Sequence, residues 1–361
     1  MLFIWENLGP THDDRLRAAA RAGFRVTAIQ FSASSNTYSW DNERDDSYRV
    51  VTLFGDGERI GFASLVARLW RAIRQTRAKA VFFCHYEVPA VFAVATLLRL
   101  LTRRRPVMMI NSKFDDRPRH LGREIVKRIM LWPYRAAMTS SRRSLDYITF
   151  LGFDPARCEM GYNSIDTARI REQAGPIAVP SFAERPFVIV ARLVDKKNIA
   201  AAIEAVAILR RGPGIARKVV VLGDGPLEGE LKRKARDLGV DDLFDFRGFV
   251  QTREVSRILG TALALVLPSI EEQFGFVVIE AFAMGVPAIC TANAGAVDIM
   301  VRNGVNGFVV DPYDPATIAS AMKLLDGDPV LHSRMAQEAL AAAPRGDAAV
   351  FAQSVGRLAA R

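Results

Sequence analysis

The chain has 361 residues, of which 50% are hydrophobic and 24% are charged. This balance is typical of a folded globular protein and excludes a disordered or fibrous one, and the length suits two domains better than one. The formal net charge is +10, and all of this excess lies in residues 1–175. These residues contain 28 Lys and Arg against 18 Asp and Glu (28 − 18 = +10), whereas residues 176–361 contain 21 basic and 21 acidic residues.

The N-terminal half begins with the short apolar run MLFIW, which has no basic region before it and therefore predicts a buried strand, not a signal peptide, in a cytoplasmic protein. The apolar stretch at 80–101 is interrupted by polar residues and does not predict a membrane span. The alternation of strand and helix patterns predicts a doubly wound α/β domain over residues 1–175. Its expected strands are 2–5, 24–30, 80–84, 107–110 and 136–139, with a helix at 13–22.

The C-terminal half shows a stronger alternation of the same kind. A Gly- and Pro-rich stretch at 172–186 predicts a linker, so a second Rossmann-like domain is expected over 185–345. The last residues, 346–361, predict a helix that crosses back to the first domain. The expected strands of the second domain are 187–190, 218–222, 244–247, 263–267, 287–290 and 307–310, with helices at 200–211 and 226–238.

Residues 263–287 predict a buried strand that ends at Pro268, then a loop, then a helix that begins near Phe274 or Gly275. Ligands of open α/β sheets bind at the carboxyl ends of strands, and the free N–H groups and dipole of a helix N-terminus favour an anion. The backbone from Phe274 to Phe276 therefore predicts a phosphate site.

Two carboxylates bracket this predicted site. Glu272 lies in the loop and Glu280 on the helix, about one turn in, where they can accept hydrogen bonds from hydroxyl groups on both sides of a nucleotide-sugar diphosphate. The alternative is that both are solvated acids near a helix N-terminus, which are favourable there without any ligand.

Two cations follow another strand, in the segment ARLVDKKN. Arg192 supplies a forked donor and Lys197 a mobile point charge, so together they can neutralise a diphosphate and the charge that develops as it departs. The alternative is a pair of ordinary surface bases.

Several segments resemble, in order and spacing, the donor domain of glycosyltransferase family four: ARLVDKKN, VVVLGDGP, FRGFV, LPSIEEQFGFVVIEAFAMGVPAI and NGVNGFVV, within residues 185–325. The resemblance implies the GT-B fold of two Rossmann-like domains that face each other across a cleft. It also implies transfer of a sugar with retention of anomeric configuration and without a metal or other cofactor. By the same resemblance, Arg192 and Lys197 grip the diphosphate, Glu272 contacts the donor sugar, Glu280 holds the ribose and Phe249 meets the base.

The N-terminal half resembles the same family more loosely, through ENLGPTHDDR at the first turn, FFCHYEVPA, and GYNSID at 161–166. Gly9 lies in that turn, where the family usually has a pair of glycines. By the resemblance, Gly9 is a candidate for contact with the donor. The family's His after the fourth strand is absent from MMINSKFDD. The candidates for the acceptor side of the cleft are His12, Asp13, Asn111, Lys113 and Asp115, although acidic loop residues and a lone His are more often turn or cap residues.

Two other segments imitate ligand motifs. The first is Asp326-Gly327-Asp328, which looks like a metal-binding DxD but follows a helical run and precedes a proline. The second is Gly223-Asp224-Gly225-Pro226, which lacks the spacing of a phosphate loop. We interpret both segments as turns. The four His and three Cys have no metal-ligand spacing, so no metal site is expected.

The basic excess of the first half is concentrated in 68–79, 99–105 and 117–128, where Arg and Lys alternate with Leu and Trp. Such stretches suit peripheral contact with an anionic membrane at the inner face. The alternative is a solvated basic surface that keeps the protein soluble. No nucleic-acid-reading motif is present, so nucleic acid is not an expected partner.

The sequence therefore predicts a retaining glycosyltransferase that moves a sugar from a UDP- or GDP-sugar to a hydroxyl of a glycan or lipid-linked acceptor, in cell-envelope or exopolysaccharide biosynthesis. No general base is assigned, because the departing phosphate can receive the acceptor's proton. The alternatives are a sugar-nucleotide epimerase on the same fold and a non-enzymatic basic binding protein.

Overall fold

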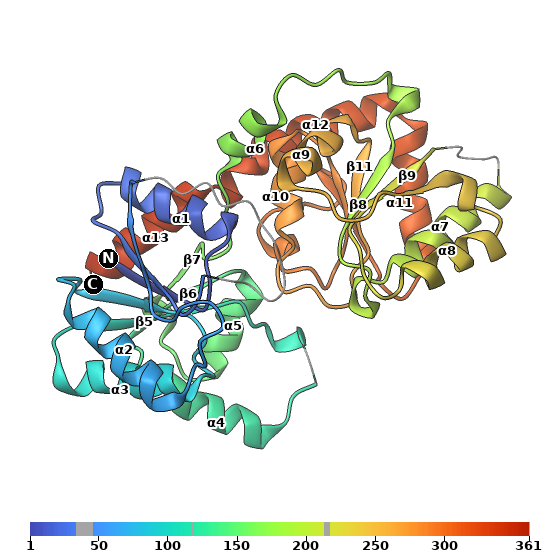
Figure 1. Cartoon of the computed structure of the whole chain (residues 1–361). Coiled ribbons are helices and arrows are strands. Elements are labelled where there is room, and N and C mark those ends of the chain that lie inside the picture. The colour runs from blue at the N-terminus through green and yellow to red at the C-terminus, as the bar shows by residue number, and fades with distance from the viewer. Residues whose placement is uncertain (34–45, 117, 213–216, 361) are drawn as a thin grey trace. The chain divides into compact units, whose positions relative to one another are not determined.

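A computed structural model describes residues 1–33, 46–116, 118–212 and 217–360 (Figure 1). The chain forms two compact units. The first comprises Met1–Asp166 together with Ala348–Arg361, and the second comprises Thr167–Asp347. Each unit is an α/β layer structure around one parallel sheet, which confirms the predicted fold class.

The first unit has a seven-stranded sheet in the order β3-β2-β1-β4-β5-β6-β7, in which all neighbours are parallel. Chain order reverses between β1 and β4, so this is the topological switch point of the sheet. The strands are β1 (Leu2–Trp5), β2 (Thr27–Gln30), β3 (Arg49–Thr52), β4 (Ala80–Phe83), β5 (Arg105–Ile110), β6 (Ala136–Thr139) and β7 (Cys158–Met160).

The helices of the first unit cover this sheet, and the last one comes from the end of the chain. Phe351 and Val355 of α13 are buried in one core cluster with Phe3 and Trp5, and the rings of Phe3 and Phe351 lie 5.5 Å apart. The helices are α1 (Pro10–Arg21), α2 (Phe62–Arg74), α3 (Pro89–Leu101), α4 (Leu121–Leu131), α5 (Arg142–Phe150) and α13 (Ala348–Ala360).

The second unit has a six-stranded parallel sheet in the order β10-β9-β8-β11-β12-β13. Taken in chain order, this is the 3-2-1-4-5-6 arrangement of dinucleotide-binding folds, whose ligands bind at the switch point between the first and fourth strands, here β8 and β11. The strands are β8 (Phe187–Val190), β9 (Val219–Leu222), β10 (Phe244–Phe246), β11 (Ala264–Leu267), β12 (Ala288–Thr291) and β13 (Gly307–Val310), close to the predicted ranges.

The second unit begins earlier than the sequence indicated. Helix α6 (Thr167–Ala174), which the predicted boundary places in the first domain, packs against α9 (Thr252–Thr261) and α10 (Phe276–Ala283), and Gln173 donates a 2.6 Å hydrogen bond to Ser256. The remaining helices are α7 (Ile199–Arg211), α8 (Glu228–Asp237), α11 (Pro315–Gly327) and α12 (Pro329–Ala342). None of the helices in the described ranges is long and apolar enough to span a membrane.

The Asp326-Gly327-Asp328 segment joins α11 to α12. Asp328 caps α12 by accepting 2.9 Å hydrogen bonds from the amides of Val330 and Leu331, and Asp326 forms an ion pair with Arg217. Both carboxylates thus have structural roles, in agreement with the interpretation of this segment as a turn.

Candidate functional site

The switch point of the second unit brings two loops together. Because β8 and β11 are hydrogen-bonded neighbours, the loops that follow their carboxyl ends meet at one sheet edge. The amides of Ile270 and Glu271 donate to the carbonyl of Lys196, at 2.9 and 3.2 Å. Asn198 joins the loops a second time by donating a 3.2 Å hydrogen bond from Nδ2 to the carbonyl of Pro268. This edge is therefore a connected structure built from both loops.

Lys197 and Glu272 meet at this edge. The Nζ of Lys197 donates to Oε2 of Glu272, and the two side chains are only 18% and 13% exposed. Ser269 lies 3.5 Å from the same carboxylate oxygen. Such a partly buried pair is less screened by solvent than a surface pair. The Lys197 ammonium can attract an anionic group, whereas the Glu272 carboxylate can accept hydrogen bonds from hydroxyl groups.

Arg192 lies at the start of the same loop and is exposed. The turn after β9 holds the backbone on either side of it: Leu193 donates a 2.8 Å hydrogen bond to the carbonyl of Asp224, and the amide of Leu227 donates to the carbonyl of Leu193 at 3.1 Å. A Cβ on Gly223 would lie 2.0 Å from the carbonyl oxygen of Ala191. Gly223-Asp224-Gly225-Pro226 is thus a structural turn, as the sequence indicated, and it supports the loop of the predicted cations.

Helix α10 begins at Phe276, one or two residues later than expected, with Gly275 as its N-cap. Gly275 has a φ of +97°, a left-handed conformation that favours glycine. Phe274 is 2% exposed and its ring lies 5.6 Å from that of Phe276, so the side chains of this turn pack inward. The first N–H groups of α10 have no partners within the helix and are directed out of its N-terminus.

Glu280 and Phe249 complete the predicted donor residues. Glu280 lies on α10, four residues after its first residue, and is half-buried. Phe249 is 46% exposed and follows Gly248, whose carbonyl accepts a 2.7 Å hydrogen bond from the amide of Gly223 at the end of β9. Phe249 therefore lies on the β9 and β10 side of the switch point, and Glu280 on the β11 side.

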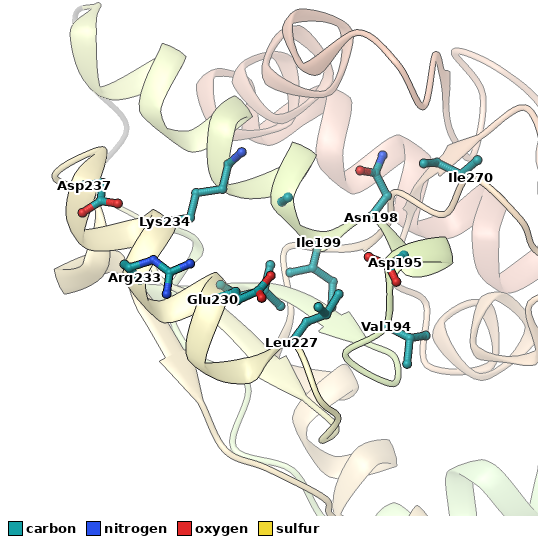
Figure 2. A pocket seen from close by; sticks show the side chains of 12 residues that line it. Val194, Asp195, Asn198, Ile199, Leu227, Glu230, Arg233, Lys234, Asp237 and Ile270 are labelled. Carbon is teal, nitrogen blue, oxygen red and sulfur yellow. The ribbon is translucent and has the colours of Figure 1, made fainter.

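A cavity of about 500 Å³ lies on the α8 side of the β8 loop (Figure 2). Asp195 and Asn198 line it from the loop, and Glu230 and Arg233 line it from α8. Lys197 and Glu272 do not line this cavity. The predicted donor site is therefore a different region of the same sheet edge.

In the first unit, Gly9 and His12 form the start of α1. Gly9 is the N-cap, and its amide donates a 3.0 Å hydrogen bond to Nδ1 of His12. Burial and the positive charge of nearby Arg15 hold the pKa of His12 well below its usual range. His12 thus has a capping contact at the start of α1, the kind of role that the sequence left open as an alternative.

Asp13 lies in the first turn of α1, and Asn111 directly follows β5. Asp13 is 4% exposed and accepts a hydrogen bond from the hydroxyl of Tyr48. Asn111 follows β5, and its Oδ1 is buried with no hydrogen-bond partner among the described residues. Of these two, only Asn111 has an unsatisfied acceptor.

Lys113 and Asp115 belong to an ion-pair network. Lys113 is 1% exposed, and its Nζ lies 2.8 Å from Asp116 and 3.4 Å from Asp115. Asp115 also forms a 2.6 Å ion pair with Arg143. The charge of the buried lysine is thus balanced within the loop, and the network holds the segment after β5 in place.

A polar group at the end of β4 was not among the candidates. His85 has a φ of +60°, which is uncommon for a residue other than glycine, and its Nδ1 lies 3.3 Å from Glu87. Cys84 lies 3.4 Å from the hydroxyl of Tyr162. Burial disfavours the charged His85 ring, but interaction with Cys84 and Glu87 raises its pKa to about 11. The signal in the sequence was the polar CHYE segment that follows an apolar strand at the switch point of this sheet.

Asn198 was also missed in the second unit. It has a left-handed φ of +51° and donates to the carbonyls of Pro268 and Pro312, at 3.2 and 2.7 Å. Its position directly before helix α7 was the available signal, because Asn is favoured at helix N-caps. Within the described ranges, no group of three His, Cys, Asp or Glu side chains is arranged to hold a metal ion.

Comparison with known families gives two matches. Residues 181–341 match the family described as glycosyl transferases group 1, and residues 14–169 match glycosyltransferase family 4. The two matches fall on the second and first units respectively.

Among curated relatives, the alpha-D-kanosaminyltransferase of Streptomyces kanamyceticus is 31% identical over 173 residues, which are 48% of this chain and 43% of that protein. The D-inositol 3-phosphate glycosyltransferase of Salinispora arenicola is 29% identical over 275 residues, 70% of this chain and 59% of that protein. The matched stretches thus span less than two thirds of the length of these relatives.

Among solved structures, Anabaena HepE in complex with UDP matches with a TM-score of 0.76 and 18% identity, over 99% of this chain and 98% of that one. The similarity in fold therefore extends over both units, as do the two family matches.

Proposed function

Because the chain belongs to the glycosyltransferases of family 4 and group 1, with the GT-B fold, we propose that it transfers a sugar from a nucleotide-sugar donor to a hydroxyl group of an acceptor. The observation that best supports this proposal is the Lys197–Glu272 pair at the switch point of the second sheet. A cation beside a carboxylate suits a ligand that has both a diphosphate and sugar hydroxyls.

In the proposed site, Arg192 and Lys197 bind the diphosphate, and the N-terminus of α10 at Gly275 and Phe276 adds amide donors. Glu272 accepts hydrogen bonds from hydroxyls of the donor sugar and Glu280 from those of the ribose, while Phe249 contacts the base. The low exposure of Lys197 and Glu272, 18% and 13%, supports this assignment, because partly desolvated charges stabilise a ligand more than exposed ones.

The proposed reaction breaks the bond between the anomeric carbon and the leaving phosphate oxygen, and the electron pair stays on that oxygen. The acceptor oxygen bonds to the anomeric carbon on the same face, so configuration is retained, and its proton passes to the departing phosphate. Lys197 and Arg192 stabilise the negative charge that develops on the diphosphate. No protein side chain is required as the base.

We propose a UDP- or GDP-sugar as the donor, and HepE in complex with UDP supports the first of these. The acceptor is a glycan or lipid-linked hydroxyl bound by the first unit, with Asn111 as the candidate contact because its Oδ1 lacks a partner within the described chain. The proposed setting is cell-envelope or exopolysaccharide biosynthesis at the cytoplasmic side of the membrane.

The proposed reaction requires no metal. Removing divalent ions with a chelator is expected to leave transfer within about twofold of the untreated rate, because Arg192, Lys197 and the α10 N-terminus supply the positive charge that a metal ion provides in other enzymes. The measurement is release of the nucleoside diphosphate from UDP- and GDP-sugars in the presence of candidate acceptors.

A loss of more than about tenfold that Mg²⁺ or Mn²⁺ restores would contradict the metal-free site. Analysis of the donor sugar after the same incubation separates the alternatives. Conversion of the donor sugar without nucleotide release would indicate an epimerase, and no turnover with any donor would favour the binding protein.

A further inference from the structure

Helix α4 of the first unit shows its apolar side to solvent. Of its residues, only Glu124 and Leu131 are buried. The exposed apolar residues lie at helical spacings of three or four, with one adjacent pair, so they share one side of the helix, which we name the outer face. The outer face consists of Leu121, Ile125, Val126 and Ile129, with Trp132 directly after the helix, and these side chains are 77%, 52%, 54%, 58% and 49% exposed.

The inner side of α4 is attached by charges and hydrogen bonds. Glu124 is 6% exposed and accepts hydrogen bonds from the hydroxyl of Tyr147 at 2.5 Å and from Lys127 at 2.9 Å. Arg119 lies 3.6 Å from the same carboxylate. A surface helix normally turns its apolar side to the core. In α4 the core side has the anchored Glu124 together with Leu131, which is buried in the core of the first unit, while the outer face stays exposed.

The end of α3 extends this apolar surface. Leu100 and Leu101 are 63% and 68% exposed. Arg99, beside them, donates a hydrogen bond to the carbonyl of Trp132 and lies 4.4 Å from the centre of its ring, so the ends of α3 and α4 adjoin. Figure 1 shows both helices along the edge of the first unit.

Basic residues border the outer face. Arg123 and Arg128 are exposed on the two flanks of α4, and Arg103 is exposed two residues after the end of α3. The only acid of α4 is the buried Glu124. An exposed apolar strip with a basic border and a terminal Trp is the pattern of a helix that lies in the interface of an anionic bilayer.

We infer that the outer face of α4, together with Leu100 and Leu101, docks this protein on the surface of an anionic lipid bilayer. The sequence indicated three basic stretches, 68–79, 99–105 and 117–128, without a choice among them, and the first overlaps α2. Helix α2 buries Leu65, Leu69 and Ile73, so its apolar side is already used in the core. Membrane docking does not depend on sugar transfer. A failure to bind membranes would therefore not contradict the proposed reaction.

The test is co-sedimentation of the full chain with phosphatidylcholine vesicles that contain or lack phosphatidylglycerol. Binding to the anionic vesicles is expected, with a marked loss at high salt. The double variant Ile125→Ser/Ile129→Ser is expected to bind at least about tenfold more weakly, because two apolar side chains no longer enter the bilayer. Both residues are exposed, so the fold is expected to persist, as checked by circular dichroism.

The matched control is Leu324→Ser/Val330→Ser, which removes two apolar side chains of the second unit that are 51% and 70% exposed. It is expected to bind like the unmodified chain. The inference would be overturned by no binding to anionic vesicles, or by an equal loss of vesicle binding in both double variants. It would also be overturned by a stable dimer in solution that the α4 substitutions dissociate, because the outer face would then bind a second copy of the chain.

Discussion

Lys197→Ala is expected to lower the rate of sugar transfer by about 10²–10³-fold, the typical effect of removing one preorganised group that stabilises developing charge. Lys197 is 18% exposed and lies beside Glu272 at the switch point, where the diphosphate leaves in the proposed reaction. Glu272→Ala is expected to have a comparable effect through the loss of donor-sugar contacts. The measurement is kcat and kcat/KM for nucleotide release.

The matched controls are the adjacent residues of the same types, Lys196→Ala and Glu271→Ala. Both side chains are exposed, and Lys196 joins the two loops through its carbonyl, which the substitution retains. These variants are expected to stay within about threefold of the unmodified rate, on the scale of ordinary surface substitutions. Unmodified activity in both Lys197→Ala and Glu272→Ala, with the fold intact, would contradict the site assignment.

Gly223→Ala is expected to destabilise the second unit and, with it, the loop of Arg192. The residue has a φ of +133°, and an added Cβ would lie 2.0 Å from the carbonyl oxygen of Ala191. The backbone conformation alone costs about 1–3 kcal/mol for a residue other than glycine, and the overlap adds to this. Because unit stability falls by several kcal/mol, we expect the midpoint of thermal unfolding to drop by roughly 5–10 °C.

Gly229→Ala is the control for this prediction. It lies in α8, and an added Cβ would have no neighbour within 4 Å. Since Ala is the better helix former, the melting temperature is expected to stay the same or rise slightly. Equal melting temperatures for the Gly223 and Gly229 variants would show that the turn after β9 does not hold the Arg192 loop as described.

Most strands of the second unit could be predicted from the sequence because they are short, buried apolar runs, as in VVVL of β9. Two strands of the first unit were missed. β3 lies at the sheet edge and is only partly buried, and β7 has three residues, CEM, so neither has an apolar run that stands out. Strand order, which locates the switch points, depends on long-range pairing that no local pattern encodes.

The donor residues were predicted to share one site, but the direct contact between Lys197 and Glu272 was not predicted. Lys197 and Glu272 are 75 positions apart, and only the pairing of β8 with β11 brings them together. For the first unit, sequence patterns mark Lys113 as a loop cation and cannot show that Asp115 and Asp116 enclose it. The reversed orientation of α4 was equally hidden, because it depends on the partners of Glu124.

The most direct test of the central claim, that the chain binds a nucleotide sugar, is the melting temperature of the purified protein with UDP-, GDP- and ADP-sugars in the absence of metal. A ligand that binds only the folded state stabilises it by about 2.7 kcal/mol at a hundred times its Kd. We predict that a UDP- or GDP-sugar raises the melting temperature and that Lys197→Ala weakens this effect. Stabilisation by no nucleotide sugar, with or without added metal ions, would contradict the account and favour the non-enzymatic binding protein.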